Sequence, residues 1–107
     1  MIWIEAKDNC AELNANLVSI NSNNEKSFLQ KLTASSKTRG FWAGGKLAAD
    51  GASFLWTDKS KFDFENWGEH QPSGDGSCLS VQWNTLWNDL SCKTSLAYIC
   101  WKSLLGR

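Results

Sequence analysis

Residues 67–92 read WGEHQPSGDGSCLSVQWNTLWNDLSC, and the rest of the chain is organised around this stretch. It contains the only proline and the only histidine, two of the four cysteines and three of the seven tryptophans. Its first half is polar and rich in glycine, which indicates a surface loop, and the alternation that begins at Cys78 indicates a strand. Carboxylates, amides and a hydroxyl occur in this stretch. Because Ca²⁺ prefers oxygen ligands of these kinds, the stretch is a candidate calcium site.

The composition describes a small, neutral chain rich in aromatic residues. Its 107 residues suit one domain, which we place over residues 1–107. Eleven basic and eleven acidic residues cancel, and this balance argues against a nucleic-acid partner. The sequence has no apolar run of about 18 residues, so it predicts no membrane span.

The four cysteines lie at positions 10, 78, 92 and 100, and no two of them form a Cys-x-x-Cys pair. A zinc finger or a thioredoxin-like redox centre therefore fits poorly. An even number of cysteines in a small domain favours two disulfides and an oxidising compartment. We therefore expect an extracellular protein, either secreted or the ectodomain of a membrane protein. Four cysteines allow three pairings, and their spacing alone does not select one.

Helical periodicity is clear near the N-terminus. Trp3, Ala6, Cys10 and Leu13 recur at steps of three and four. This spacing predicts a helix over residues 2–14 with these four side chains on its buried face.

A second helix is predicted from Ser22 to about Leu32. Ser22 and Glu25 form a capping box, in which a serine hydroxyl and a glutamate three residues later satisfy the first backbone N–H groups. Phe28, Leu29 and Leu32 are expected to form the buried stripe of this helix.

Short apolar and aromatic runs predict strands. We expect strands at residues 17–20, 41–45, 54–56, 78–83, 87–89 and 96–101. Two helices combined with such strands indicate an α+β fold with an antiparallel sheet rather than alternating βαβ units. Phe62, Phe64 and Trp67 lie in an otherwise polar segment and are expected to anchor a long loop to the core.

Several short motifs follow one another along nearly the whole chain. They are Trp3-Ile4-Glu5-Ala6 with Cys10, Ala15–Ile20, Glu25 with Phe28-Leu29, Phe41–Gly45, Phe54–Asp58, Asn66-Trp67, Gln71-Pro72, Cys78, Trp87–Asp89, Cys92 and Tyr98–Cys100. Their order and spacing together resemble the C-type lectin-like family. The resemblance implies two helices packed on short antiparallel sheets, with a long loop region and two disulfides.

The resemblance also selects one cysteine pairing, Cys10 with Cys100 and Cys78 with Cys92. The first bridge would join the N-terminal helix to the last strand, and the second would hold the loop region. Family members usually have a strand before the first helix, whereas this chain begins in that helix. We therefore expect the last strand to have a free edge that invites pairing with a partner.

The family's sugar-binding branch suggests what the loop does. There, a Glu/Gln-Pro-Asn/Asp tripeptide and an Asn-Asp pair hold one calcium ion, and sugar hydroxyls complete the shell of the ion. The resemblance therefore implies Ca²⁺ as cofactor, with Gln71, Asn88 and Asp89 as ligands that also contact a carbohydrate. It further implies a cis peptide bond before Pro72.

Ser73 departs from the family pattern, because it stands where Asn or Asp is expected. We keep Ser73 among the metal and carbohydrate ligands, although a hydroxyl is a weaker ligand than a carboxylate. The segment 73–77 is short and lacks the Glu that sugar binders carry before the cysteine, so Asp75 is the carboxylate that could substitute. The two negative charges of Asp75 and Asp89 balance the charge of one Ca²⁺ with none left over. We therefore expect the site to bind calcium weakly.

The resemblance implies calcium-dependent carbohydrate binding, with a slight preference for galactose-type sugars because Gln71 begins the tripeptide. The alternative is a calcium-independent domain of the same fold that binds a protein or a surface and has a degenerate metal site. No enzyme is expected, since the chain has no Ser/His/Asp arrangement and no Cys/His pair outside the disulfides. A weak single-site binder gains from multivalency, so a homo-oligomer is compatible with this function.

Overall fold

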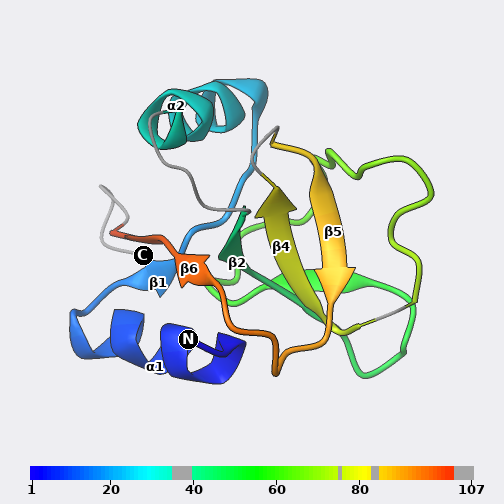
Figure 1. Cartoon of the computed structure of the whole chain (residues 1–107), viewed down its shortest axis with the longest axis horizontal. Coiled ribbons are helices and arrows are strands. Elements are labelled where there is room, and N and C mark those ends of the chain that lie inside the picture. Colours follow the sequence, from blue (N-terminus) through cyan, green and yellow to red (C-terminus); the bar gives the residue numbers. More distant parts are fainter. Residues whose placement is uncertain (35–39, 75, 83–84, 103–107) are drawn as a thin grey trace.

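The computed structural model describes residues 1–34, 40–74, 76–82 and 85–102. Helices α1 (Trp3–Glu12) and α2 (Asn23–Thr33) lie at opposite ends of the molecule, with the sheet strands between them (Figure 1). The strands are β1 (Asn16–Leu17), β2 (Gly40–Leu47), β3 (Phe54–Trp56), β4 (Cys78–Gln82), β5 (Trp87–Leu90), β6 (Ala97–Tyr98) and β7 (Cys100–Trp101). The predicted α+β class is confirmed.

The strands form two sheets. The larger sheet has the order β3-β2-β4-β5, with antiparallel neighbours, and β6 pairs with β2 in parallel. The smaller sheet joins β1 to β7 in antiparallel register. The predicted strand at 96–101 is therefore split, because its two halves pair with different sheets.

The segment after β1 connects the two sheets. The N–H of Val18 donates to the carbonyl of Ile99 at 3.0 Å, and the N–H of Gly44 donates to the carbonyl of Val18 at 2.8 Å. Only Leu17 of the strand predicted at 17–20 belongs to a strand, because β1 ends there. The backbone of Val18 bonds to Ile99 on one side and to Gly44 on the other. Val18 and Ile20 are nevertheless buried, as their apolar character predicts.

Helix α1 buries Trp3, Ala6 and Cys10, as the periodicity predicts. The indole N–H of Trp3 donates to the carbonyl of Ala43 at 2.9 Å, which joins the helix to β2. The prediction that Leu13 belongs to the buried face is wrong. The helix ends at Glu12, and Leu13 is its C-cap residue with 61% of its surface exposed.

Helix α2 begins at the predicted cap. The Ser22 hydroxyl accepts from the N–H of Glu25 at 3.2 Å, and the Glu25 carboxylate accepts from the N–H of Asn21 at 2.6 Å. The predicted buried stripe is wrong for two of its three members, because Phe28 and Leu32 are 57% and 55% exposed. Only Leu29 is buried on this helix, so α2 contacts the core along a narrow line.

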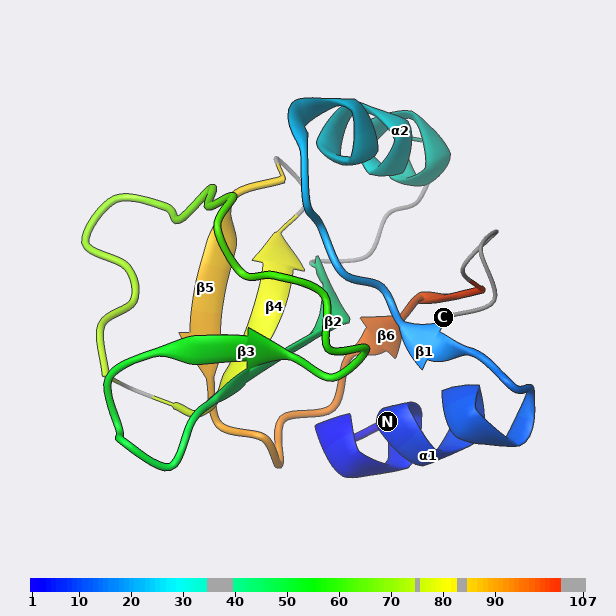
Figure 2. The same cartoon turned by 180° about the vertical axis from the view of Figure 1, so that it is seen from behind.

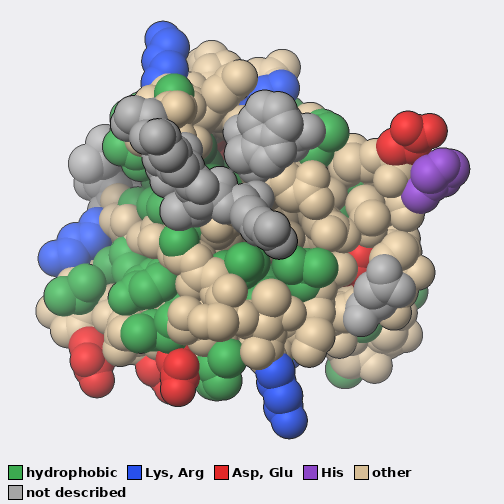
Figure 3. Space-filling model, in the orientation of Figure 1, with side chains coloured by type: hydrophobic (Ala, Val, Ile, Leu, Met, Phe, Trp, Pro, Cys, Tyr) green, Lys and Arg blue, Asp and Glu red, His purple; other side chains and the backbone are tan. Residues whose placement is uncertain are grey.

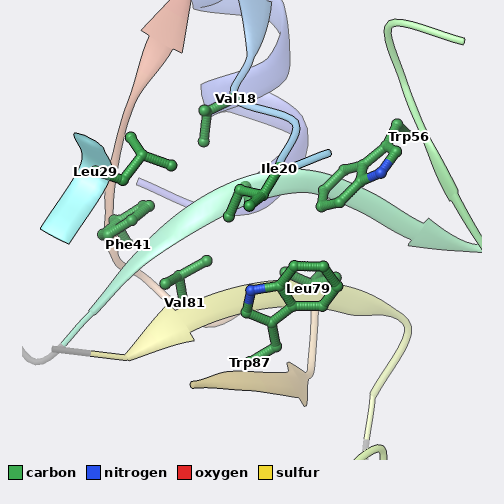
Figure 4. Close-up of a cluster of buried hydrophobic side chains, with 9 residues drawn as sticks. Val18, Ile20, Leu29, Phe41, Trp56, Leu79, Val81 and Trp87 are labelled. Carbon is green, nitrogen blue, oxygen red and sulfur yellow. The ribbon is translucent and has the colours of Figure 1, made fainter. Parts of the chain in front are cut away.

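Leu29 enters the larger of two buried clusters. Figure 4 shows this cluster between α2, β2, β4 and β5, with the side chains pointing toward one another. Its buried members are Val18, Ile20, Leu29, Phe41, Ala43, Trp56, Leu79, Val81 and Trp87. The second cluster surrounds Trp3 and Trp42 under α1.

Both disulfides have the expected partners. Cys10 in α1 is bonded to Cys100 in β7, and Cys78 at the start of β4 is bonded to Cys92 after β5. In the chain-entropy description, closing the 90-residue separation stabilises the fold by about 4–5 kcal/mol and closing the 14-residue one by about 3 kcal/mol. For one small domain, each bridge is a large share of the net stability.

The narrow contact of α2 can be tested with two neighbouring substitutions. Leu29→Ala is expected to lower the free energy of unfolding by about 2–4 kcal/mol, because it leaves a cavity in the core. Phe28→Ala, the matched control, is expected to change it by less than about 0.5 kcal/mol, since most of that ring is in solvent. Urea unfolding followed by tryptophan fluorescence measures both, and similar losses for the two variants would contradict the described packing.

Candidate functional site

Aromatic rings hold the long loop after β3 against the sheet. The ring of Phe62 stacks on Trp56 with centroids 4.7 Å apart, and Trp67 lies 5.1 Å from Phe54 and 5.6 Å from Trp87. Seen from behind, the chain that follows β3 passes across β4 and β5 before it turns outward (Figure 2). The prediction that these aromatic residues, together with Phe64, anchor the loop is confirmed.

Backbone bonds then bring the loop alongside β5. The N–H of Trp87 donates to the carbonyl of Asn66 at 2.9 Å, and the N–H of Gly68 donates to the carbonyl of Trp87 at 3.0 Å. The chain turns back at His70, and the N–H of Gln71 donates to the carbonyl of Gly68 at 3.0 Å. The Gln71–Pro72 peptide bond is cis, as the resemblance implied.

The carboxylate of Asp89 lies at the centre of the site. Asp89 is buried, with 1% of its surface exposed, at the end of β5. Its Oδ1 accepts from the Ser73 N–H at 2.8 Å and the Ser73 hydroxyl at 3.2 Å. Its Oδ2 accepts from the N–H of Gly74 at 2.8 Å and, at the longer distance of 3.4 Å, that of Gly76. We call Asp89 with Ser73, Gly74 and Gly76 the Asp89 loop anchor.

Two glycines allow the loop to reach this carboxylate. Gly74 has φ of +87°, a conformation that glycine adopts without steric cost. Gly76 lies so close to β5 that any Cβ there would collide with the backbone of Leu90 and Ser91. Only glycine therefore permits the backbone at position 76 to approach Asp89.

The hydrogen bonds determine the charge state of Asp89. Burial by itself raises the pKa of a carboxyl group, because it penalises the charged form. The N–H groups of Ser73, Gly76 and Gly74 outweigh this effect and hold the pKa of Asp89 below its ordinary value of 3.8. Asp89 is therefore an anion at neutral pH, and its charge is compensated by backbone dipoles of the loop.

The structure describes two of the remaining predicted ligands, Gln71 and Asn88. The Oε1 atom of Gln71 is buried without a hydrogen-bond partner. Asn88 is half-buried, and its main-chain carbonyl accepts from the hydroxyl of Ser80 at 3.1 Å. Along β5, buried Trp87 and Asp89 alternate with half-buried Asn88 and Leu90. Asp75 lies outside the described residues.

The predicted ligands that the structure describes fit a calcium ion poorly. Calcium takes six to eight oxygen ligands and is bound most tightly by several carboxylates. Among the described residues, no group of three or more His, Cys, Asp and Glu side chains is gathered to hold a metal. The unpartnered Oε1 of Gln71 is one neutral oxygen that could bind a cation. This single oxygen does not compensate for the two Asp89 oxygens, which already accept hydrogen bonds from the loop.

An open pocket of about 460 Å³ adjoins the loop anchor. One wall is the turn between β2 and β3, and the other is the loop after Pro72. Asp89 is the only acidic side chain among the described residues that line it. These are Leu47, Gly51, Ala52, Phe54, Pro72, Gly74, Gly76, Ser77 and Asp89.

The sequence predicts Asp89 as a site residue but does not predict that the loop N–H groups are its hydrogen-bond partners. The available signal was the alternation of glycine in Ser73–Ser77, which frees the backbone to approach a side chain. The turn between β2 and β3 contains the turn-forming pair Asp50-Gly51, yet its place beside the loop follows only from the tertiary structure. Figure 3 shows acidic and basic side chains scattered over one face, with no dominant patch of one sign.

The fold and the site together define a small disulfide-bonded domain with a long, anchored loop. The chain matches the model of the lectin C-type domain over residues 1–102, so it belongs to the C-type lectin family. No helix of the described residues has the length and apolar character needed to cross a membrane.

Two relatives illustrate the similarity. Ladderlectin of Oncorhynchus mykiss is 39% identical over 101 residues, which cover 87% of this chain and 53% of that protein. The galactose-specific lectin nattectin of Thalassophryne nattereri is 30% identical, covering 97% of this chain and 69% of that protein. The chain thus spans between about half and two thirds of the length of these relatives.

Two solved structures share the fold. The carbohydrate-recognition domain of cow CD23, solved in the presence of a GlcNAc2Man3 oligosaccharide, is 32% identical with a TM-score of 0.85, covering 94% of this chain and 78% of that one. A calcium-independent type II antifreeze protein is 27% identical with a TM-score of 0.83, covering 94% and 77%. Sugar binding and calcium independence therefore both occur among proteins similar to this chain.

The anchor predicts how stability depends on pH. A carboxyl group whose pKa falls on folding stabilises the fold above its ordinary pKa, and this contribution is lost as the pH falls through the lower, folded pKa. Asp89→Asn is therefore expected to be less stable than the wild type at neutral pH, with the difference narrowing below pH 3.8. Urea unfolding at a series of pH values measures this difference.

Asp63→Asn is the matched control. Asp63 is exposed, and its one ion pair within the described part of the chain is with Lys61 at 3.8 Å, so replacing it should change the stability little at any pH. A stability difference between wild type and Asp89→Asn that does not change with pH would contradict the role of the carboxylate.

Proposed function

We propose that this chain is an extracellular carbohydrate-binding module whose ligand lies against the anchored loop. The observation that carries the proposal is the Asp89 loop anchor, which ties Ser73, Gly74 and Gly76 to β5 beside an open pocket. A loop whose backbone is already hydrogen-bonded to the rest of the protein loses less conformational entropy when a ligand binds, so more of the contact energy appears as affinity.

The chemistry of the pocket suits a sugar. Leu47, Phe54 and Pro72 supply apolar surface, Ser77 supplies a hydroxyl, and the lining glycines supply backbone carbonyls. Ligand sites commonly combine an apolar lining with a few placed polar groups. A pyranose ring presents both kinds of surface, through its C–H faces and its hydroxyls.

Support for a sugar also comes from similar proteins. Nattectin is named a galactose-specific lectin, and the CD23 domain was solved in the presence of an oligosaccharide. Galactose is therefore the first sugar to test, in agreement with the preference that Gln71 implies. Affinity for a single sugar is expected to be weak, and clustering of several copies would raise the avidity.

The calcium-dependent form of this function stays a prediction. It would place the ion among Gln71, Ser73, Asp75, Asn88 and Asp89. Such an ion would supply a Lewis-acidic centre for sugar hydroxyls. The poor fit of the described ligands leads us to test sugar binding both with CaCl₂ and with EDTA.

A pocket-filling substitution tests the proposed site. Ala52 is exposed and lines the pocket, so Ala52→Trp is expected to abolish at least nine tenths of the glycan signal by occupying the space of the sugar. Ala49→Trp is the matched control, because Ala49 is exposed on the same turn and is not among the described lining residues. A glycan array with wild type and both variants measures the effect.

Two results would contradict the proposal. The first is the absence of glycan binding by the wild type both with CaCl₂ and with EDTA. The second is equal loss of binding in Ala52→Trp and Ala49→Trp, which would move the site away from the pocket.

The second candidate is calcium-independent binding to a surface. Its support is the similarity to the calcium-independent type II antifreeze protein, together with the poor fit of the calcium ligands. If the ligand were an ice surface, the purified protein would show thermal hysteresis in the presence of EDTA. We expect no thermal hysteresis if carbohydrate binding is the function, and nanolitre osmometry distinguishes the two.

A further inference from the structure

We infer that Asp89 holds the ligand-binding loop from within the protein, in place of a calcium ion, so that the loop anchor forms without metal and the domain binds its ligand in EDTA. The statement about the ligand rests on the proposed function. The statement about the loop does not, because it depends only on the contacts of Asp89.

The carboxylate of Asp89 has little capacity left for a cation. A carboxylate offers about four lone-pair positions on its two oxygens. Three backbone N–H groups and one hydroxyl are directed at Asp89, two at each oxygen. A cation that took over these oxygens would leave part-buried N–H groups without their acceptor, which is unfavourable.

The loop backbone also occupies the space where a further ligand side chain would have to begin. A Cβ at position 76 would collide with Leu90, so no carboxylate can be introduced there without moving the loop away from β5. The same close approach brings the Gly76 N–H to within 3.4 Å of Asp89. The close approach of Gly76 to β5 therefore excludes a metal-binding side chain at position 76 and also supplies a hydrogen-bond donor to Asp89.

The local charge is consistent with this arrangement. Among the described residues that line the pocket, Asp89 carries the only formal negative charge. The partial positive charges of the loop N–H groups already compensate it. The unpartnered oxygen of Gln71 is neutral and adds no charge to attract a divalent ion.

Amide exchange in the wild-type protein tests the inference directly. The amide protons of Ser73, Gly74 and Gly76 are expected to have the same exchange rates and chemical shifts in EDTA as in CaCl₂, within a factor of two in rate. The amides of Ala52 and Ser53 are an internal control, since they donate to the exposed carboxylate of Asp50 at 2.9 Å and 3.0 Å. NMR spectroscopy on labelled protein measures all five.

Calcium-dependent changes confined to the loop would overturn the inference. If CaCl₂ shifted the signals or accelerated exchange at Ser73, Gly74 and Gly76 but not at Ala52 and Ser53, an ion would be competing for Asp89. A heat of CaCl₂ binding in calorimetry that disappears in Asp89→Asn would have the same meaning.

Thermal unfolding provides a second readout. Asp89→Asn is expected to lower Tm by roughly 5 °C or more, by the same amount in CaCl₂ and in EDTA, because charge-assisted hydrogen bonds are lost. Asp63→Asn is expected to leave Tm within about 2 °C of the wild type. A wild-type Tm that rises in CaCl₂ would overturn the inference, since a ligand that binds the folded state raises Tm. If Asp89→Asn does not fold, the amide exchange and Tm of the wild type in CaCl₂ and in EDTA still test the inference.

The glycan array separates this inference from the proposed function. Binding to a sugar that persists in EDTA supports both. Sugar binding that requires CaCl₂ would overturn the inference and leave the function standing. No sugar binding, together with calcium-insensitive loop amides, would overturn the function and its ligand statement while supporting the metal-free loop.

Discussion

The burial of one carboxylate constrains the long loop and the end of β5. Asp89 cannot lie inside the protein as an anion unless donors surround it, and backbone N–H groups of the loop supply them. The loop is thus drawn onto the end of β5, and the pocket forms between it and the turn after β2. Trp87, two residues earlier and also buried, gathers the aromatic rings that hold the other end of the loop.

Much of the fold was predictable because its signals are local. Helix α1, the Ser22 cap and the aromatic anchors follow from spacing or from single side chains. Phe28 and Leu32 were misplaced because apolar character does not show how wide the contact of a helix is. The split of the last strand could not be foreseen either, since its two halves pair with partners distant in sequence.

The candidate site, like the fold, was predictable only in part. The importance of Asp89 and the cis bond before Pro72 followed from the resemblance. The partners of Asp89 did not, because a motif names side chains and the partners here are mainly backbone N–H groups. Ser73 shows the difference well. As a ligand it looked weak, whereas its N–H and hydroxyl both donate to the carboxylate that it was expected to assist.

The aromatic anchoring of the loop has an optical consequence. Trp87 makes edge contacts with Trp56 and Trp67, with centroids 5.5 Å and 5.6 Å apart. Indoles at such separations couple their intense far-ultraviolet transitions, so the far-ultraviolet circular dichroism of the native protein should carry an exciton signal from this group. Because Trp67 belongs to the loop and Trp87 to β5, the part of this signal that comes from their pair would be lost if the loop moved away from the sheet.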